Sequence, residues 1–289
     1  MLKNRISIIG SGWVGTAVGK GFVEKGYEVI FYDIVDKDLP NFTNDLNHAI
    51  ENSEVSFICV PTPFGDQGID LSYIKDAAKS IGEALATKGP EEYHLVVVKS
   101  TVVPTTTERV VIPILEQYTK KKAGEFGVCM NPEFLTEISG SWSTDTEYKR
   151  GFFTEDRIVI GEYDIKSGDA LAELYAPLNT PIFRTDLKTA EMIKYASNCV
   201  LATKISYWNE IYSICNELGI DSHEVADIVG ADPRIGKYGT VHGKAFGGKC
   251  LPKDLKALVA FADEYHEAKL LKAVDEINEK IKSKYGVRE

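Results

Sequence analysis

The chain has 289 residues, 44% hydrophobic and 26% charged, a composition typical of a globular protein with one large or two average domains. The formal net charge of -10 and the lack of a basic run argue against nucleic acid or an anionic membrane as a partner. Neither a long apolar run nor a signal-peptide pattern occurs, so we expect a cytoplasmic protein. The five cysteines form no C-x-x-C pair, which argues against a disulfide framework and against a metal site.

Short apolar runs alternate with helical patterns over the first two thirds of the chain. This alternation predicts βαβ units and therefore an α/β fold, with a Rossmann-type parallel sheet over residues 1–186. The predicted strands are 5–10, 27–33, 55–60, 94–100, 126–130, 157–161 and 181–185, and the predicted helices begin near residues 13, 43, 71, 104 and 167.

From residue 187 onward the pattern is almost wholly helical. No proline or glycine interrupts residues 187–218, which predicts one long central helix closed by Gly219. Ser222 is expected to cap the next helix, and a glycine-rich loop over 230–248 leads to two further helices. We expect residues 187–289 to form an all-helical dimerisation domain.

The segment GSGWVG lies directly after the first predicted strand. It places Gly10, Gly12 and Gly15 around Trp13 and Val14, a spacing that lets a pyrophosphate approach the start of a helix. Alternatively, this is a tight glycine-rich turn that binds nothing.

Asp33 ends the second predicted strand, about 20 residues after the glycines. A carboxylate there would bind the ribose hydroxyls of NAD and repel the phosphate of NADP, so we expect NAD, although Lys37 is close in sequence. Thr62 in CVPTP and Thr101 in KST follow the third and fourth strands, where ligands bind in open parallel sheets. Both segments could equally be ordinary connections.

The stretch FGGKCLPKD places Cys250 just before a predicted helix that starts with Pro252 and Asp254. The positive end of that helix and the neighbouring Lys253 favour a reactive thiolate. Gly247 and its neighbour remove side chains that would block a substrate. The alternative is an inert, buried cysteine.

Two further groups of side chains suggest chemistry. Lys194 and Asn198 are four residues apart on the long helix and therefore share a face, where they could stabilise an oxyanion, or simply be solvated. Glu133 and Glu137 in NPEFLTE follow the fifth strand. A carboxylate there could act as a general base if its surroundings raise its pKa, or it could be an ordinary loop acid.

Taken together, the motifs resemble the nucleotide-sugar dehydrogenases, the family of UDP-glucose 6-dehydrogenase and GDP-mannose 6-dehydrogenase. The motifs IGSGWVG, CVPTP, KST, NPEFL, AEMIKYASN, PRIG and FGGKCLPKD occur in the family's order and cover nearly the whole chain. The resemblance implies that the C6 alcohol of a nucleotide sugar is oxidised to a carboxylate with two NAD, through a cysteine thiohemiacetal and thioester.

The resemblance also implies roles for particular residues. Cys250 would be the nucleophile, Lys194 and Asn198 would hold the C6 oxygen, Asp254 would support them, and Thr101 would help to order water and cofactor. Glu133 would be the base for hydrolysis. The remaining implied contacts are Glu137 near the nicotinamide, Phe134, Leu135, Phe246 and Gly247 at the sugar nucleotide, and Arg234 offered across a homodimer.

Three features depart from the family's pattern. The family usually continues into a third, Rossmann-like domain that grips the nucleotide, which a separate chain could supply here. The segment 136–156 is longer than expected and could form a lid. Val241 stands where UDP-glucose enzymes tend to carry a lysine, so Lys237, His242 or Lys244 could substitute for it.

Two other functions fit parts of the sequence. A β-hydroxyacid dehydrogenase shares the Rossmann domain and long helix and uses a helix lysine, but it oxidises once and needs no cysteine. A non-catalytic subunit that binds NAD or dimerises would also explain the motifs of the first domain.

Overall fold

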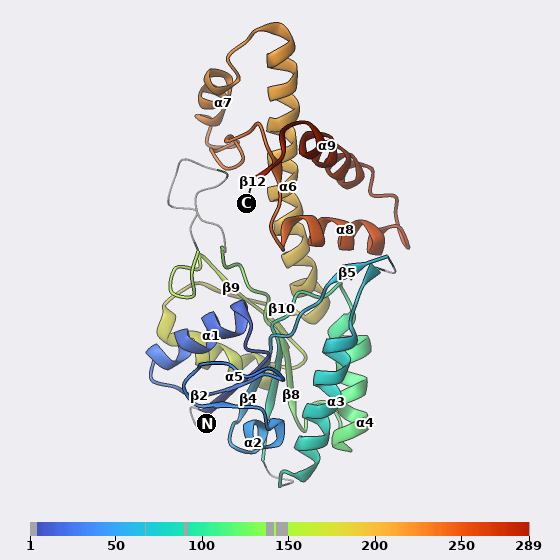
Figure 1. Ribbon diagram of the computed structural model, residues 1–289. Helices are drawn as coiled ribbons and strands as arrows, with labels where there is room; N and C mark the ends of the chain where they lie inside the picture. Colours follow the sequence, from blue (N-terminus) through green and yellow to red (C-terminus); the bar gives the residue numbers. More distant parts are fainter. Residues whose placement is uncertain (1–4, 67, 90–91, 137–141, 143–149, 289) are drawn as a thin grey trace. The chain divides into compact units, whose positions relative to one another are not determined.

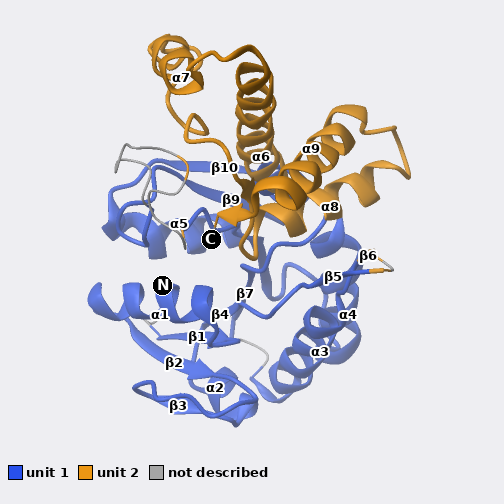
Figure 2. Cartoon of the chain, turned by 45° about the horizontal axis from the view of Figure 1, so that its top comes forward, with its two compact units in different colours: residues 1–65, 69–135, 150–194 blue, residues 66–68, 136–149, 195–289 orange. Residues whose placement is uncertain are grey.

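The computed structural model describes residues 5–66, 68–89, 92–136, 142 and 150–288. The chain divides into two compact units (Figure 2). Unit 1 covers residues up to 65, 69–135 and 150–194, and unit 2 covers 66–68, 136–149 and 195 onward. The expected domain boundary between residues 186 and 187 stays a prediction, since residues 187–194 pack with unit 1 although their helix continues into unit 2.

Unit 1 is built on an eight-stranded sheet in the order β10-β9-β8-β7-β4-β1-β2-β3 (Figure 1). The chain winds outward from β1 in both directions, so the order reverses between β1 and β4. Ligands of doubly wound sheets bind at such a point, beyond the carboxyl ends of the strands. The strands are β1 (Arg5–Ile9), β2 (Glu28–Tyr32), β3 (Phe42–Thr43), β4 (Val55–Ile58), β7 (Leu95–Val98), β8 (Gly127–Met130), β9 (Ile158–Glu162) and β10 (Ile182–Asp186).

The sheet is parallel except at one place. β9 pairs antiparallel with β8, whereas β10 is parallel to β9, so the last two strands run opposite to the others. A parallel neighbour requires a crossover, usually a helix, and the described residues between β8 and β9 contain none. The predicted Rossmann-type parallel sheet is therefore confirmed for most of its strands, and the antiparallel pairing of β9 with β8 is the exception.

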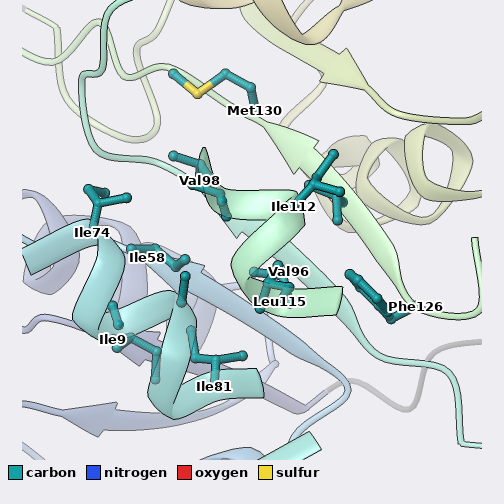
Figure 3. Close-up of a cluster of buried hydrophobic side chains, with 14 of the residues drawn as sticks. Ile9, Ile58, Ile74, Ile81, Val96, Val98, Ile112, Leu115, Phe126 and Met130 are labelled. Atoms are coloured by element: carbon teal, nitrogen blue, oxygen red, sulfur yellow. The ribbon is translucent and has the colours of Figure 1, made fainter. Parts of the chain in front are cut away.

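Helices cover both faces of the sheet (Figure 1). Successive strand residues alternate between two apolar clusters. Ile58 and Val98 belong to the cluster under α3 and α4 (Figure 3). Phe57 and Val97 belong to the cluster under α1 and α5. The helices and small elements of this part of the chain are α1 (Trp13–Glu24), α2 (Leu46–Glu51), α3 (Ser72–Thr87), the π-helical turn η1 (Thr107–Val111), α4 (Ile112–Thr119), α5 (Ile165–Tyr175), the 3-10 turn η3 (Ala176–Leu178), β5 (Phe64–Gly65) and β6 (Gly68–Ile69).

One helix of unit 1 begins later than the sequence suggests. Thr105 has a φ of 77°, a left-handed conformation that is unusual for a β-branched residue. A helix cannot pass through this conformation, so the helix expected from Pro104 begins only at η1 and continues as α4.

Unit 2 is mainly helical. The long helix α6 (Leu187–Leu218) has the predicted limits, and Gly219 ends it with a φ of 68°. The other elements are α7 (Ser222–Gly230), β11 (Ala245–Phe246), α8 (Leu251–Ala262), α9 (Lys269–Tyr285) and β12 (Val287–Arg288). The prediction of an all-helical domain is wrong at one place, because β11 and β12 form a two-stranded sheet.

The cap of α7 differs from the prediction. Asp221, not Ser222, is the N-cap, because its side chain accepts a hydrogen bond from the N–H of His223. Ser222 Oγ instead lies 2.8 Å from His242 Nε2. No helix within the described ranges is both long and apolar enough to cross a bilayer.

Candidate active site

The turn between β1 and α1 has the geometry of a dinucleotide site. Gly10 has a φ of 97°, and a Cβ there would lie 2.8 Å from the carbonyl oxygen of Cys59. A Cβ at Gly15 would lie 2.1 Å from the carbonyl oxygen of Gly10. At Gly12, the N-cap of α1, no atom of the described residues other than its neighbours along the chain lies within 4 Å of the Cβ position. The turn therefore leaves room for a pyrophosphate beside Trp13 and Val14.

Asp33 is held beside this turn. Its Oδ2 accepts from the N–H of Ser11 at 2.9 Å and its Oδ1 from the N–H of Val35 at 3.1 Å. Each carboxylate oxygen can accept a further hydrogen bond, so Asp33 can also take the hydroxyls of a ribose. The residues present fit an NAD molecule.

Thr62 and Thr101 lie together, although 39 residues separate them in the sequence. Thr62 Oγ1 donates to the carbonyl oxygen of Thr101 at 2.7 Å, and Ser100 Oγ donates to the carbonyl oxygen of Val60 at 2.7 Å. These bonds join the segments that follow β4 and β7, next to the point where the strand order reverses. Both segments were expected to line the cofactor site, and this role stays a prediction.

Glu133 and Lys194 form a buried ion pair. Lys194 Nζ donates to Glu133 Oε1 at 2.8 Å and to the carbonyl oxygen of Glu133 at 2.7 Å. The two side chains are only 4% and 8% exposed, for Lys194 and Glu133 respectively. The sequence placed these residues in separate roles, and the structure pairs them.

The ion pair changes what is expected of Glu133. Burial alone would raise the pKa of Glu133, but the charge and hydrogen bond of Lys194 and the N–H of Leu135 bring it below its usual value. The condition that the surroundings raise this pKa is therefore not met. At neutral pH Glu133 is an ionised carboxylate and can accept a proton.

Lys99 is a second buried cation, and its charge interacts with that of Glu133. Lys99 Nζ donates to Asn131 Oδ1 at 2.8 Å and to the Tyr175 hydroxyl at 3.3 Å. Burial lowers the pKa of Lys99, an effect that Glu155 and Glu133 oppose. Burial likewise raises the pKa of Glu155, while Lys99 opposes it.

Sequence reasoning missed this network, because its members come from four separate segments. The one available signal was a lysine at the end of the apolar run LVVVK.

Glu191 on α6 was also missed. Its two carboxylate oxygens accept from the N–H groups of Thr105 at 2.6 Å and Thr107 at 2.7 Å. Burial raises the pKa of Glu191 to about 7, against the lowering effect of these hydrogen bonds. The carboxylate thus holds Thr105 in its left-handed conformation, in the loop that follows Thr101.

Cys250 is the only one of the five cysteines that is exposed. It is the N-cap of α8, and its carbonyl oxygen accepts from the N–H of Asp254 at 2.9 Å. By contrast, burial raises the pKa of Cys59 and of Cys199 to about 12. Cys250 is therefore not the buried cysteine of the alternative interpretation, and its reactivity stays a prediction.

Asp254 is buried, and both of its carboxylate oxygens have a polar partner. Asn198 Nδ2 donates to its Oδ2 at 2.5 Å, and Lys253 Nζ lies 2.6 Å from its Oδ1. The ammonium of Lys253 therefore forms an ion pair with Asp254, a contact that the sequence did not suggest. Asn198 follows Lys194 by one turn of α6, as predicted.

Comparison with known proteins gives the family of this chain. Residues 35–179 match the NAD binding domain of the UDP-glucose/GDP-mannose dehydrogenase family, and residues 188–280 match the central domain. The chain belongs to this family. Its NAD-binding domain supports NAD as the cofactor.

Individual relatives agree. The UDP-glucose 6-dehydrogenase of Haloferax volcanii is 39% identical over 95% of this chain and 69% of its own length. The GDP-mannose 6-dehydrogenase of Pseudomonas aeruginosa is 39% identical over 90% of this chain and 64% of its length. A UDP-glucose dehydrogenase structure from Pyrobaculum islandicum superposes with a TM-score of 0.86 at 34% identity, covering 96% of this chain and 68% of that one.

The chain therefore spans about two thirds of the length of these dehydrogenases. The two matched domains are the NAD-binding and central domains, so the resemblance seen in the motifs is confirmed.

The structure gives the surroundings of the four residues that were expected to contact the sugar nucleotide, Phe134, Leu135, Phe246 and Gly247. Phe134 is half-buried, with the Cζ of Arg157 4.0 Å from its ring centroid, and Leu135 binds Glu133 through its N–H. Phe246 is only 1% exposed, and a Cβ at Gly247 would lie 2.2 Å from Val287 Cγ1. Gly247 is thus required by packing against β12, and the substrate contacts of all four stay predictions.

Arg234 and the suggested lysine substitutes lie in the loop between α7 and β11. Arg234 is exposed and pairs with Asp232 at 2.6 Å, so its role across a dimer stays a prediction. His242 is 5% exposed and its ring nitrogens bond Ser222 and the Thr240 carbonyl, which removes it from the candidates. Lys237 and Lys244 are exposed.

Glu137 lies outside the described residues, and so does most of the expected lid segment 136–156.

Proposed function

We propose that this chain oxidises the C6 alcohol of a nucleotide sugar, UDP-glucose, to a carboxylate in two hydride transfers to NAD. Cys250 carries the proposal, because a single-oxidation dehydrogenase has no use for an exposed thiol at a helix N-terminus. The family of the chain, together with the fit of NAD to the β1–α1 turn, supports it.

In the first oxidation, Lys194 and Asn198 hold the C6 oxygen. An ammonium and an amide N–H one helical turn apart stabilise the negative charge that develops on this oxygen. The β1–α1 turn and Asp33 would hold NAD, which would supply the hydride acceptor for C6. Thr101 helps to order the water that takes up the proton of the hydroxyl, and Asp254 supports Asn198 through the hydrogen bond between them.

In the second oxidation, the Cys250 thiolate adds to the aldehyde carbon and forms a thiohemiacetal. Loss of the second hydride leaves a thioester, and no free aldehyde is released. Water then attacks the thioester carbon while the ionised Glu133 accepts a proton, and the C–S bond breaks to restore the thiolate. Glu133 is ionised at neutral pH and so is free to accept this proton, although its lowered pKa makes it a weaker base than a carboxylate with a raised pKa.

The stoichiometry of NADH tests this mechanism. Incubation with UDP-glucose and NAD should give two NADH per sugar, whereas GDP-mannose and UDP-N-acetylhexosamines should react more slowly. One NADH per sugar would point to a β-hydroxyacid-type dehydrogenase, and none with any nucleotide sugar would reject the activity.

Cys250→Ser should abolish formation of the second NADH. Cys215→Ala is the matched control, because that cysteine is buried on α6 and has no proposed role. Full activity of Cys250→Ser would contradict the nucleophile role.

Since the chain spans about two thirds of its relatives' length, a non-catalytic role is the second candidate. Calorimetry distinguishes the two: a binding subunit would bind NAD without binding a nucleotide sugar. Recovery of nucleotide-sugar binding on adding a separate nucleotide-binding chain would show that a partner completes the site.

We also propose a homodimer through α6. Val200, Tyr207 and Ile214 are 59%, 51% and 50% exposed and follow one another at seven-residue intervals, so they form an apolar stripe on one face of the helix. Light scattering should show a dimer that Ile214→Glu converts to a monomer. A monomeric wild type would contradict the proposal.

A further inference from the structure

The segment Gly243–Phe246, which leads to Cys250, has almost no regular structure of its own. Its two-residue strand β11 pairs with β12, and Ala245 donates from its N–H to the carbonyl oxygen of Gly286 at 3.0 Å. Further backbone groups of the segment are bound by side chains.

Two buried asparagines supply these bonds. Asn209 on α6, 0% exposed, accepts from the N–H of Gly243 and donates to the carbonyl oxygen of Lys244, both at 2.8 Å. Asn278 on α9, 2% exposed, accepts from the N–H of Phe246 at 2.8 Å and donates to its carbonyl oxygen at 3.1 Å. Each amide thus acts as donor and acceptor toward the same short stretch of backbone.

Only Gly247, Gly248 and Lys249 separate this anchored segment from the nucleophile. Gly247 packs against Val287, and Gly248 has a φ of 75°. Helix α8 follows immediately, and its start is held by the bond from Asp254 to the Cys250 carbonyl oxygen. The cysteine is therefore exposed while the backbone on both sides of it is held. All these residues belong to unit 2 (Figure 2).

We propose that Asn209 and Asn278 are positioning residues that clamp the segment before Cys250 and thereby set the place of its thiol. The inference rests on the proposed function for its purpose, but the clamp itself is a property of the fold. Buried amides are costly unless fully hydrogen-bonded, and here both are matched to backbone groups of one segment.

Hydrogen exchange tests the clamp without any assumption about activity. In Asn278→Ala and Asn209→Ala, the amides of residues 246–250 should exchange about tenfold faster, because buried hydrogen bonds that limit local opening are lost. Ser206→Ala is the matched control: Ser206 is buried and joins α6 to the carbonyl oxygen of Val274 at 3.0 Å without touching the segment. Equal exchange in all three variants would overturn the clamp.

The stoichiometry of NADH tests the purpose of the clamp. The first oxidation needs no thiol, so both asparagine variants should form fewer than two NADH per sugar and release aldehyde that hydroxylamine traps. The KM for NAD should stay unchanged, since the cofactor turn lies in unit 1, and Ser206→Ala should behave as wild type.

Faster exchange with an unchanged NADH ratio would overturn the positioning role. Should Asn278→Ala fail to fold, the isosteric Asn278→Asp replaces the donor to the Phe246 carbonyl with a negatively charged carboxylate oxygen that repels it, and it is expected to show the same changes. A wild type that forms no NADH with any nucleotide sugar would overturn the proposed function and this purpose together, and hydrogen exchange would still decide the clamp.

Discussion

Replacing Lys194 with methionine would leave a carboxylate buried without its cation. Lys194 Nζ lies 2.8 Å from Glu133 Oε1, and both side chains are almost completely buried. At this distance the gross Coulomb attraction is about 6 kcal/mol at an effective dielectric constant of about 20. Because desolvation offsets part of that attraction, we expect the free energy of unfolding to fall by about 3–5 kcal/mol at pH 8.

The pH dependence of the loss follows from the pKa of Glu133. In the wild type this pKa is lowered, so its contribution to stability is present at neutral pH and is lost as the pH falls below the usual carboxyl range. In Lys194→Met burial dominates and raises the pKa of Glu133, so the carboxyl group takes up a proton as the pH falls. Because proton binding is linked to folding, the loss of stability in the variant should therefore become smaller as the pH falls from about 8 to about 5.

Urea denaturation followed by circular dichroism measures this deficit. The double variant Glu133→Gln with Lys194→Met should recover most of the loss, because no charge remains buried. Lys188→Met, an exposed lysine on the same helix, is the control and should change little. A deficit below about 1 kcal/mol at pH 8, the range of a surface pair, or one that does not vary with pH, would refute the reasoning.

Three further substitutions probe other buried or binding groups. Glu191 has a pKa raised from 4.5 to about 7, so its contribution to the free energy of unfolding should fall by on the order of 3 kcal/mol as the pH rises from 4.5 to 7. In urea titrations, Glu191→Gln should remove this dependence of stability on pH. Burial and the charge of Lys88 hold the pKa of His94 well below 6.5, so its contribution to stability is lost as the pH falls below 6.5. His94→Gln should therefore make the melting temperature less sensitive to acid. Asp33→Asn should raise the KM for NAD about tenfold or more and reduce the preference over NADP, as measured from initial rates.

Each of these expectations can fail clearly. An unchanged pH slope in Glu191→Gln would mean that the carboxyl group is not the titrating one. Equal acid sensitivity with and without His94 would remove it as the source. An unaltered ratio of NAD to NADP would show that Asp33 does not contact the ribose.

Much of this protein follows from local sequence patterns. The alternation of apolar runs with helical patterns predicted the sheet and its helices, and the absence of proline and glycine predicted both limits of α6. The glycines of the β1–α1 turn and Asp33 are recognisable because their task depends on backbone conformation and on spacing within one βαβ unit. Cys250 stood out for a similar reason, since the start of a helix is visible in the sequence around it.

The pairing of side chains could not be read in the same way. Glu133 and Lys194 are 61 residues apart, and Asn198 and Asp254 are 56 apart, so no local pattern relates them. The antiparallel pairing of β9 with β8 and the hydrogen bond from Thr105 to Glu191 likewise depend on contacts between segments that are distant in the sequence. Local propensity sets the conformation of each segment, but the charge state of a buried group depends on which distant segments pack around it.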